Sequence, residues 1–452
     1  MAKDQSPRDV PDRELQTVNI LSSWIRLVRA APRARAVIEA AGEKVFSRAD
    51  LSARAEAWRA ARTEHLNGQR VVFALPNSAA WFEVFLGLLQ AGALPAALDP
   101  SEPLLAQREL ARAIGATWLY FDGRLEKISA PRRPRRHDIC LLKITSGSTG
   151  APCALPFTHA QMLADGRQIC RTMGIGPGDL SLAVIPLGHS YGLGNLVMPL
   201  LAQGTPLVCA SAPLPHALAA DCKRWRPTVF PAVPALLRAL AASDIATDAL
   251  GSLRLVISAG SPLPEETAQA FFARTGLSPH AFYGTSETGG ITFDRDGEAT
   301  RLGRSVGTPL KGVWLRFARG RRFSVVSEAV AGRGSHSPAD RAVLNEEGEL
   351  VLLGRTGRMV KIAGRRLDLT ELETALRRVP GVRDAFAAPH PALAGELAAA
   401  VATDLSAGAV RSLLRERLAA WKIPHRLMVL PVFPLTARGK TDRPALQKLL
   451  EP

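Results

Sequence analysis

Blocks of apolar and polar residues alternate along the chain and predict helices and strands in turn. The clearest helical period runs through residues 49–64, where Leu51, Ala55 and Trp58 fall on one face. One apolar face and one charged face are typical of a helix that covers a larger core.

A strand–helix–strand unit follows this helix. Residues 71–75 form a short apolar run that predicts a buried strand, and Asn77 predicts the cap of the next helix. Gly92 ends that helix, and residues 93–98 predict a second strand. A crossover of this kind joins parallel strands, so the pattern favours an α/β layer.

The same rhythm recurs downstream without a fixed period, which argues against solenoids and propellers. Strands are expected at 139–144, 182–185, 206–209, 229–230 and 253–257, and helices near 193 and 236–240. We therefore expect an α/β fold whose large N-terminal domain contains mixed or parallel sheets with helices.

A composition shift near residue 354 predicts a second, smaller domain. Strands are expected at 323–326 and 349–353, before a Gly-Arg pair and a basic segment. In that segment Thr370 and Glu373 have the spacing of a capping box. The expected organisation is a large domain (1–355), a hinge (354–358) and a small α+β domain (356–452).

Composition narrows the class of protein. The 452 residues are 47% hydrophobic and 22% charged, as in globular proteins. Lys and Arg number 57 against 41 Asp and Glu, a net charge of +16 that favours an anionic partner. Five cysteines without a C-x-x-C pair, and a polar N-terminal stretch, predict a reduced, cytoplasmic protein without a transmembrane segment.

A hydroxyl-rich loop is the strongest local signal. It follows an apolar strand and comprises Thr145, Ser146, Gly147, Ser148, Thr149 and Gly150. Glycines let backbone N–H groups converge on an anion, and hydroxyls add donors. The Lys of a P-loop is absent, so the loop predicts a different phosphate cradle.

A second motif admits a different reaction. The run from Gly188 to Gly192 fits G-x-S-x-G, with Ser190 as the nucleophile of a serine hydrolase and His390 or His425 as its base. A five-residue pattern of this kind arises often by chance.

A third segment combines an aromatic ring, hydroxyls and a carboxylate. Tyr283, Gly284, Ser286 and Glu287 stand within five residues, at an expected strand-to-loop junction. An aromatic ring can stack on a purine, and a carboxylate beside hydroxyls can hold Mg²⁺ on phosphates.

Taken in order, these segments resemble the acyl-adenylating superfamily of acyl- and aryl-CoA ligases, peptide-synthetase adenylation domains and luciferases. The resemblance covers about residues 45–445. It rests on LPNSAAWFEVFLGLLQAGALPAALDP, TSGSTGAP, YGTSE, GRTGRMVKIAGRRLDLTELE and PLTARGKTDR.

The resemblance implies a role for each matching residue. The 145–150 loop would wrap the phosphates of ATP, Tyr283 would stack on adenine, and Glu287 would hold Mg²⁺. Asp340 would bind the ribose, and Arg355 would contact the ribose and a phosphate. Lys440 would bridge the acyl carboxylate and the α-phosphate, where a cation stabilises accumulating charge.

The acyl pocket and the acceptor side follow from the same resemblance. His189, Tyr191, Gly192, Gly260 and Ser261 would line the pocket. The stretch from His189 to Asn195 carries no Lys or Arg, which favours an aromatic or fatty carboxylic acid over a substrate with a polar group. After the small domain rotates, Lys361 and Gly364 would face the site of a phosphopantetheine thiol.

Two departures from the family pattern stand out. Cys153 occupies the position of the Lys after Thr-Gly-x-Pro, which removes a phosphate cation. Gly357 stands where the hinge usually has Asp or Lys, and glycine tolerates the rotation. A non-catalytic, adenylate-binding descendant is therefore an alternative, beside the hydrolase.

The charge of the C-terminal segment indicates an anionic acceptor. Residues 356–452 contain 16 Lys and Arg and 9 Asp and Glu. Acyl carrier proteins are acidic and CoA is polyanionic, so either would be attracted here, with a slight preference for a separate carrier protein and none for nucleic acid.

Overall fold

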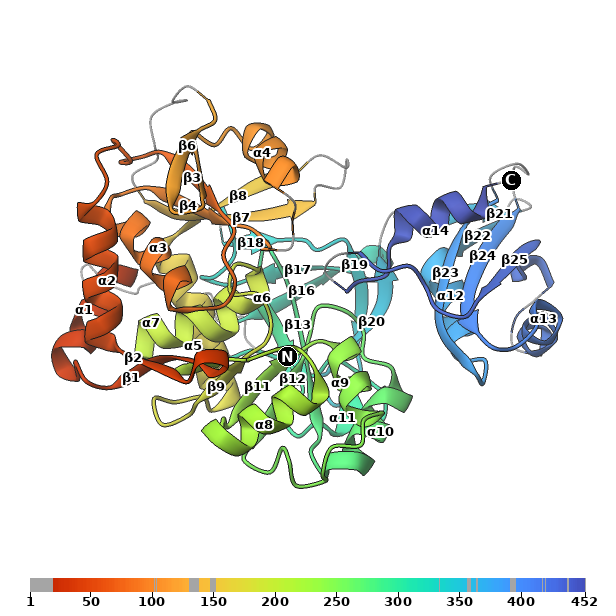
Figure 1. Ribbon diagram of the computed structural model, residues 1–452. Coiled ribbons are helices and arrows are strands. Elements are labelled where there is room, and N and C mark those ends of the chain that lie inside the picture. The colour runs from red at the N-terminus through yellow and green to blue at the C-terminus, as the bar shows by residue number, and fades with distance from the viewer. Residues whose placement is uncertain are drawn as a thin grey trace, which may run out of the picture. The chain divides into compact units, whose positions relative to one another are not determined.

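The computed structural model divides the chain into two compact units (Figure 1). Unit 1 comprises Met1–Leu302, Leu310–Val313 and Ser327–Ser335, and unit 2 comprises Gly303–Pro309, Trp314–Val326 and His336–Pro452. The described residues are 19–100, 102, 104–129, 138–146, 152–332, 334–355, 359–362, 365–390, 396–416, 418, 420–436 and 439–451.

This division differs from the expected cut at residue 355. The strands between residues 314 and 355 group with the C-terminal segments, and two short stretches return to unit 1. A sequence pattern cannot show such returns, because they depend on packing between distant segments. The hinge at 354–358 stays a prediction, since residues 356–358 lie outside the described part.

The main sheet of unit 1 is parallel at its centre and antiparallel at each end. Its order is β14-β13-β12-β11-β9-β10-β1-β2, with parallel pairing from β13 to β1. The strands are β1 (Arg35–Glu39), β2 (Lys44–Ser47), β9 (Ser181–Ala183), β10 (Leu207–Cys209), β11 (Val229–Ala232), β12 (Leu255–Ser258), β13 (Pro279–Thr285) and β14 (Gly289–Phe293). The expected α/β class is confirmed.

A second sheet and a hairpin complete the strands of unit 1. The sheet has the order β4-β3-β5-β6, and the hairpin pairs β7 with β8. Their bounds are β3 (Arg70–Phe73), β4 (Leu94–Ala97), β5 (Trp118–Phe121), β6 (Arg124–Lys127), β7 (Ile139–Ser146) and β8 (Pro152–Thr158). Strands β3 and β4 are parallel, which confirms the predicted crossover.

Helices pack against these sheets. They are α1 (Ile20–Ala30), α2 (Arg48–Ala60), α3 (Ala79–Gln90), α4 (Leu104–Ala113), α5 (His159–Met173), α6 (Ser190–Gly192), a π-helix η2 (Leu193–Val197), α7 (Met198–Gln203), α8 (Pro215–Trp225), α9 (Pro234–Ala241), α10 (Glu265–Thr275) and α11 (Glu298–Arg301). Leu51, Ala55 and Trp58 of α2 are buried, as their spacing predicts. The cap of α3 is Ser78, so the prediction of Asn77 as its cap is wrong.

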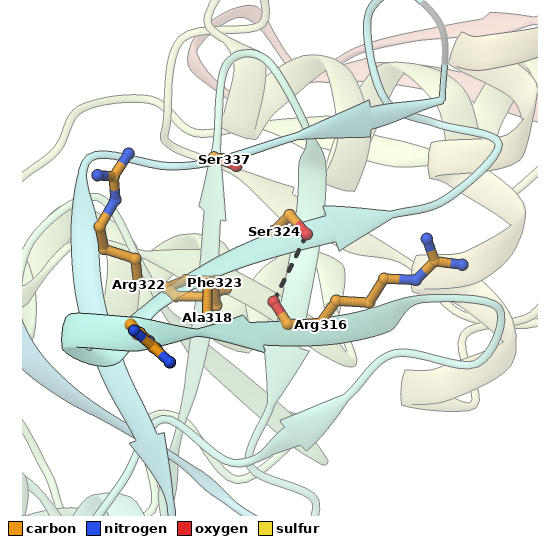
Figure 2. Close-up of a pocket in the computed structure, with 7 residues that line it drawn as sticks. Arg316, Ala318, Arg322, Phe323, Ser324 and Ser337 are labelled. Carbon is orange, nitrogen blue, oxygen red and sulfur yellow. Dashed lines mark hydrogen bonds between the residues drawn. The ribbon is translucent and has the colours of Figure 1, made fainter.

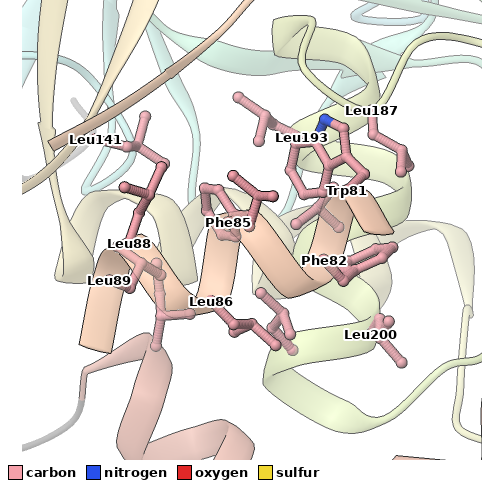
Figure 3. Close-up of a cluster of buried hydrophobic side chains, with 14 of the residues drawn as sticks. Trp81, Phe82, Phe85, Leu86, Leu88, Leu89, Leu141, Leu187, Leu193 and Leu200 are labelled. Atoms are coloured by element: carbon pink, nitrogen blue, oxygen red, sulfur yellow. The ribbon is translucent and has the colours of Figure 1, made fainter. Parts of the chain in front are cut away.

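Helix α3 is the centre of the largest core. Nine of its twelve residues are buried, so it is apolar all round rather than on one face. Figure 3 shows Trp81, Phe85 and Leu88 on α3, with Leu193 of the π-helix and Leu141 of β7 in the same cluster. The rings of Trp81 and Phe85 stack with centroids 4.9 Å apart. This core therefore joins α3 to the segments that lead into the predicted site.

Unit 2 contains an antiparallel array of four strands that forms the main path of a five-stranded sheet, together with a hairpin and a three-stranded sheet. The array has the order β16-β17-β19-β20 and the small sheet β23-β24-β25. The bounds are β16 (Trp314–Ala318), η3 (Arg319–Arg321), β17 (Arg322–Val326), β19 (Asp340–Leu344), β20 (Leu350–Arg355), β21 (Met359–Ile362), β22 (Arg365–Asp368), α12 (Leu369–Arg377), β23 (Val382–Pro389), β24 (Leu397–Thr403), α13 (Ala407–Arg415), β25 (Arg426–Leu430) and α14 (Arg443–Leu450). An α+β character for residues after 356 is thus confirmed.

Within the described ranges, no helix combines the length and the apolar character that crossing a membrane requires.

We expect Trp81→Ala to lower the free energy of unfolding by about 3–5 kcal/mol, because it leaves a cavity in the α3 core. Trp81 is 1% exposed, whereas Trp314, the matched control, is 62% exposed. Denaturant unfolding should show little change for Trp314→Ala. Equal losses for the two variants would contradict the assignment of α3 as the core helix.

Candidate functional site

Several predicted site residues of unit 1 follow parallel strands of the main sheet. His189 follows β9, Gly260 and Ser261 follow β12, and Glu287 follows β13. Parallel strands that pair in one sheet end at the same edge, as Figure 1 shows for β9, β11 and β12. Ligands of open α/β sheets bind outside this carboxyl edge. The fold therefore brings these residues to one edge.

His189 lies beside a carboxylate that follows a strand of the other sheet. Its Nε2 is 3.3 Å from Oδ2 of Asp99, whose side chain is only 7% exposed, but the pair does not have hydrogen-bond geometry. Asp99 comes just after β4, and the imidazole is 31% exposed. The imidazole therefore stands next to an acidic side chain and stays partly accessible.

Asn77 fixes the segment that precedes His189. Its side-chain amide donates to the carbonyls of Ala183 (3.1 Å) and Ile185 (2.9 Å), and its oxygen accepts from the N–H of Leu187 (3.0 Å). Sequence reasoning missed this role of Asn77 and the role of Asp99. The available signal was a polar residue just after each of two buried strands.

Tyr191 is tied to the sheet rather than free in a pocket. Its hydroxyl donates to the carbonyl of Ile257 (3.2 Å), with that of Ala232 at 3.4 Å. Burial raises the pKa of Tyr191 well above its usual value. Its ring lies 5.9 Å from that of Phe282. Its assignment to the substrate pocket stays a prediction.

The glycines of the G-x-S-x-G match have a packing explanation. A Cβ at Gly192 would overlap the carbonyl of Pro186, and one at Gly188 would lie 2.6 Å from Cβ of Ala97. No hydrogen bond joins Ser190 to a histidine among the described residues, and the neighbouring His189 faces Asp99. The arrangement gives a Ser190 hydrolase no support.

The turn between β13 and β14 presents the predicted metal ligand. The N–H of Thr285 donates to Oγ1 of Thr288 (3.2 Å), and the carbonyl of Glu287 accepts from the N–H of Ala331 (2.8 Å). The backbone of the turn is therefore fixed, while Ser286 and Glu287 are half-buried.

This turn fits a hydrated metal ion better than a closed protein cage. Among the described residues, no three His, Cys, Asp or Glu side chains lie close enough to enclose a metal ion. Mg²⁺ is commonly bound by one or two carboxylates together with waters and substrate phosphates. Glu287 beside the Ser286 hydroxyl suits that donor set.

The first strand of the β13–β14 hairpin carries the residues predicted to contact adenine. Tyr283 pairs with Thr292 and Gly284 with Gly290 across the two strands. Tyr283 is half-buried and Gly284 is exposed. Stacking of Tyr283 on adenine stays a prediction.

The predicted phosphate loop connects β7 and β8. Thr145 pairs with the exposed, free Cys153 at the end of this hairpin where the loop joins the two strands. The loop residues Gly147, Ser148, Thr149 and Gly150, and the side chains of Thr145 and Ser146, lie outside the described part. Lys143, two residues before Thr145, is buried, and sequence reasoning gave it no role.

In unit 2, two predicted nucleotide-binding residues stand opposite each other. Asp340 of β19 pairs with Arg355 of β20. Lys361 lies on β21 opposite Arg366. The side chains of Arg355 and Lys361, and all of Gly364, lie outside the described residues, so their roles stay predictions.

The predicted catalytic lysine lies on a tight, exposed loop. The N–H of Thr436 donates to the carbonyl of Lys440 (2.7 Å), and the N–H of Lys440 donates to Oγ1 of Thr436 (3.3 Å). Thr441 follows and donates its hydroxyl to Asp384 (3.0 Å). These bonds fix the backbone of Thr436 and Lys440, and Lys440 is exposed.

An ion pair anchors the residues just after this loop. Arg443 donates to both oxygens of Glu373, at 3.0 and 2.9 Å, and the Glu373 side chain is 2% exposed. Glu373 also accepts from the N–H of Ala387 (2.9 Å). The capping box predicted from Thr370 and Glu373 is wrong, because α12 already begins at Leu369 and Glu373 serves the lysine loop instead.

Two family models match the chain. The model described as AMP-binding enzyme matches residues 111–318, and the one described as AMP-binding enzyme C-terminal domain matches residues 371–440. The chain belongs to this family of acyl-adenylating enzymes.

Similar proteins span most of the chain. A benzoate–CoA ligase of Thauera aromatica is 29% identical over 70% of this chain and 66% of its own length. An anthranilate–CoA ligase of Pseudomonas aeruginosa is 27% identical over 85% of this chain and 87% of its own. The structure of ATP-bound MatB from Rhodopseudomonas palustris has the same fold, with a TM-score of 0.82, 21% identity, and coverage of 96% of this chain and 99% of that one.

We expect Arg443→Met to lower the free energy of unfolding of unit 2 by about 3 kcal/mol, because it leaves the buried Glu373 carboxylate without its main partner. The double variant Glu373→Gln/Arg443→Met should recover most of this loss. Denaturant unfolding measures both variants. No recovery in the double variant would contradict the anchoring role of the pair.

Proposed function

We propose that this protein is an AMP-forming ligase that activates a carboxylic acid with ATP and transfers the acyl group to a phosphopantetheine thiol. The observation that carries the proposal is the match of both family models, of which the C-terminal one ends at the predicted catalytic Lys440. A cytoplasmic location belongs to the proposal and rests on the reduced cysteines.

In the first half-reaction, a carboxylate oxygen attacks the α-phosphorus of ATP. The bond from that phosphorus to the bridging oxygen breaks, and pyrophosphate leaves with the electron pair. Lys440 neutralises the charge that builds up between carboxylate and phosphate. Glu287 holds Mg²⁺, which offsets the negative charge of the phosphates when bound.

The acid is proposed to be aromatic, with a fatty acid as the second choice. The segment from His189 to Asn195 contains no Lys or Arg, and the His189 side chain is partly accessible beside Asp99. A binding segment without basic side chains suits an aromatic ring better than a polar substrate group. The names of the similar proteins, which include benzoate and anthranilate ligases, support the same choice.

In the second half-reaction, the thiol sulfur attacks the acyl carbon of the adenylate. The bond to the phosphate oxygen breaks, AMP leaves, and the thiol proton passes to the medium. We propose CoA as the acceptor, supported by the names of the similar proteins. A carrier protein is the alternative acceptor. It is also anionic, and it carries the same phosphopantetheine arm as CoA.

A basic pocket in unit 2 supports a polyphosphate acceptor. It has a volume of about 250 Å³ and is lined by Arg316, Arg319 and Arg322 together with Ser324 and Ser337. Figure 2 shows Arg316 and Arg322 extending from β16 and β17 in different directions. Guanidinium groups spread around a rim suit an extended ligand with several phosphates, as CoA is, better than one phosphate.

The register of the strands places this pocket beside the predicted nucleotide residues. Arg322 pairs with Arg341, the neighbour of Asp340, and Asp340 pairs with Arg355. Two strand spacings separate the Arg322 and Arg355 positions, which is about 10 Å. An acceptor held at the pocket would thus lie near the end of the array that carries Asp340.

The first test is pyrophosphate exchange into ATP with a panel of aryl and fatty acids. We expect exchange with at least one aryl acid, and its loss in Lys440→Ala, while Lys440→Ala still transfers the acyl group from a supplied acyl-adenylate. Lys448→Ala, which changes an exposed lysine on α14, is the control and should keep both steps. Absence of exchange with every acid would count against the proposed function, and equal loss of both steps in Lys440→Ala would count against the role of Lys440.

The second test concerns the acceptor. We expect Arg316→Gln/Arg322→Gln to raise KM for CoA about fivefold and to leave KM for pantetheine unchanged, since pantetheine lacks the phosphates. Arg321→Gln, in the same turn but outside the pocket lining, is the control. An equal rise for CoA and pantetheine would contradict the pocket as a phosphate site, and preference for a holo-carrier protein in competition with CoA would change the acceptor.

A further inference from the structure

A buried lysine lies directly before the predicted phosphate loop. The side chain of Lys143 on β7 is 2% exposed, and its Nζ lies 4.0 Å from Oδ2 of Asp165, whose side chain is 3% exposed. The same Nζ lies 4.1 Å from the centre of the Phe157 ring. No hydrogen-bond acceptor reaches it in the described part of the chain.

Stability does not explain this pair. Removing a lysine and an aspartate from water is costly, and an apolar pair of similar size is often equally or more stable. The cost is visible in both groups: burial lowers the pKa of Lys143 and raises the pKa of Asp165, and each is opposed by the charge of the other. Because burial of Lys143 and Asp165 costs free energy, their place beside the predicted site is better explained by the segments that they position.

Asp165 has a second contact, and that contact leads to the metal-binding turn. Its Oδ1 accepts from the N–H of Gly290 (3.0 Å), at the start of β14. Gly289 has a φ of 69°, and a Cβ there would overlap the Asp165 carboxylate. The turn that presents Glu287 therefore rests on this carboxylate.

Lys143 is not placed to replace the missing phosphate cation at Cys153. It pairs with Leu155, two positions further along the hairpin, a separation of about 7 Å. Its charge is already opposed by Asp165, whereas Cys153 is exposed. The negative charge of Glu287 also favours the charged form of Lys143, which raises its pKa against the effect of burial.

We propose that Lys143 and Asp165 are a pair of positioning residues that hold the Glu287 turn against the strand leading into the phosphate loop. The pair sets the binding of Mg²⁺ with ATP without touching either ligand. This inference rests on the proposed function, because that function assigns Mg²⁺ to Glu287.

The experiment compares Lys143→Met with the wild-type chain by calorimetric titration of ATP, with Mg²⁺ and with EDTA, in the absence of any acid. We expect affinity for Mg-ATP to fall about tenfold, as is typical when a partner behind a metal ligand is lost, and affinity for metal-free ATP to change little. Leu155→Met, a change of similar volume at the paired position, is the control and should bind both forms like the wild type. Equal losses for Mg-ATP and metal-free ATP would overturn the proposal.

Two double variants distinguish a positioning role from a purely structural role and from direct phosphate binding. Lys143→Met/Asp165→Asn removes both charges. We expect its unfolding midpoint to return to that of the wild type while its Mg-ATP binding stays weak. This variant therefore still tests the proposal if Lys143→Met folds poorly. Recovery of Mg-ATP binding in that variant would reduce the pair to a structural role and overturn the proposal. Lys143→Met/Cys153→Lys should not recover binding, and recovery would identify Lys143 as a substitute phosphate cation instead.

The outcome is distinguishable from failure of the proposed function. The titrations contain no acid, so they report on ATP and Mg²⁺ alone. If Lys143→Met loses affinity for Mg-ATP but not for metal-free ATP relative to the wild type, the positioning role stands. If no acid then supports pyrophosphate exchange by the wild type, the ligase proposal alone fails.

Discussion

The parallel pairing of β9, β11, β12 and β13 is the constraint on which the site depends. Strands that pair in parallel must end at one edge, so the loops after them meet there whatever their sequences. Once that edge exists, short-range chemistry decides what it does. His189 and Glu287 gain their roles from this edge and from the residues that hold them.

The holding residues come from far away in the chain, and this limits what the sequence can predict. Asn77 bonds to Leu187 across 110 residues, and Asp165 bonds to Gly290 across 125. A local pattern predicts that Asn77 caps the next helix, because no local signal reveals the distant carbonyls. Lys143 and Asp165 have apolar neighbours and an unremarkable spacing, so only the folded chain brings them together.

Local structure was predictable for the opposite reason. The helix with Leu51, Ala55 and Trp58, the crossover from β3 to β4, and the turn with Tyr283 and Glu287 each depend on neighbouring residues. The fold class and the family followed from several such segments in order. The division into units was not predictable, since residues 310–313 and 327–335 pack with unit 1 although their neighbours do not.

The excess of positive charge, which at first indicated only an anionic partner, can now be assigned to particular residues. Arginines of β16, η3 and β17 line a pocket beside Asp340, and the basic C-terminal segment holds Lys440 on a loop anchored by Arg443 and Glu373. Charge of this kind suits ATP and a phosphate-bearing thiol better than a nucleic-acid groove, where aromatic and basic residues would line a continuous track.

The most direct test of the acyl-adenylate mechanism follows oxygen atoms. A carboxylic acid that supports turnover is labelled with ¹⁸O in both carboxyl oxygens and incubated with the protein, ATP, Mg²⁺ and CoA. The masses of the products are then measured by mass spectrometry. Attack of the carboxylate on the α-phosphorus predicts AMP that carries one labelled oxygen, together with pyrophosphate. Unlabelled AMP, or formation of ADP and labelled phosphate, would contradict this mechanism.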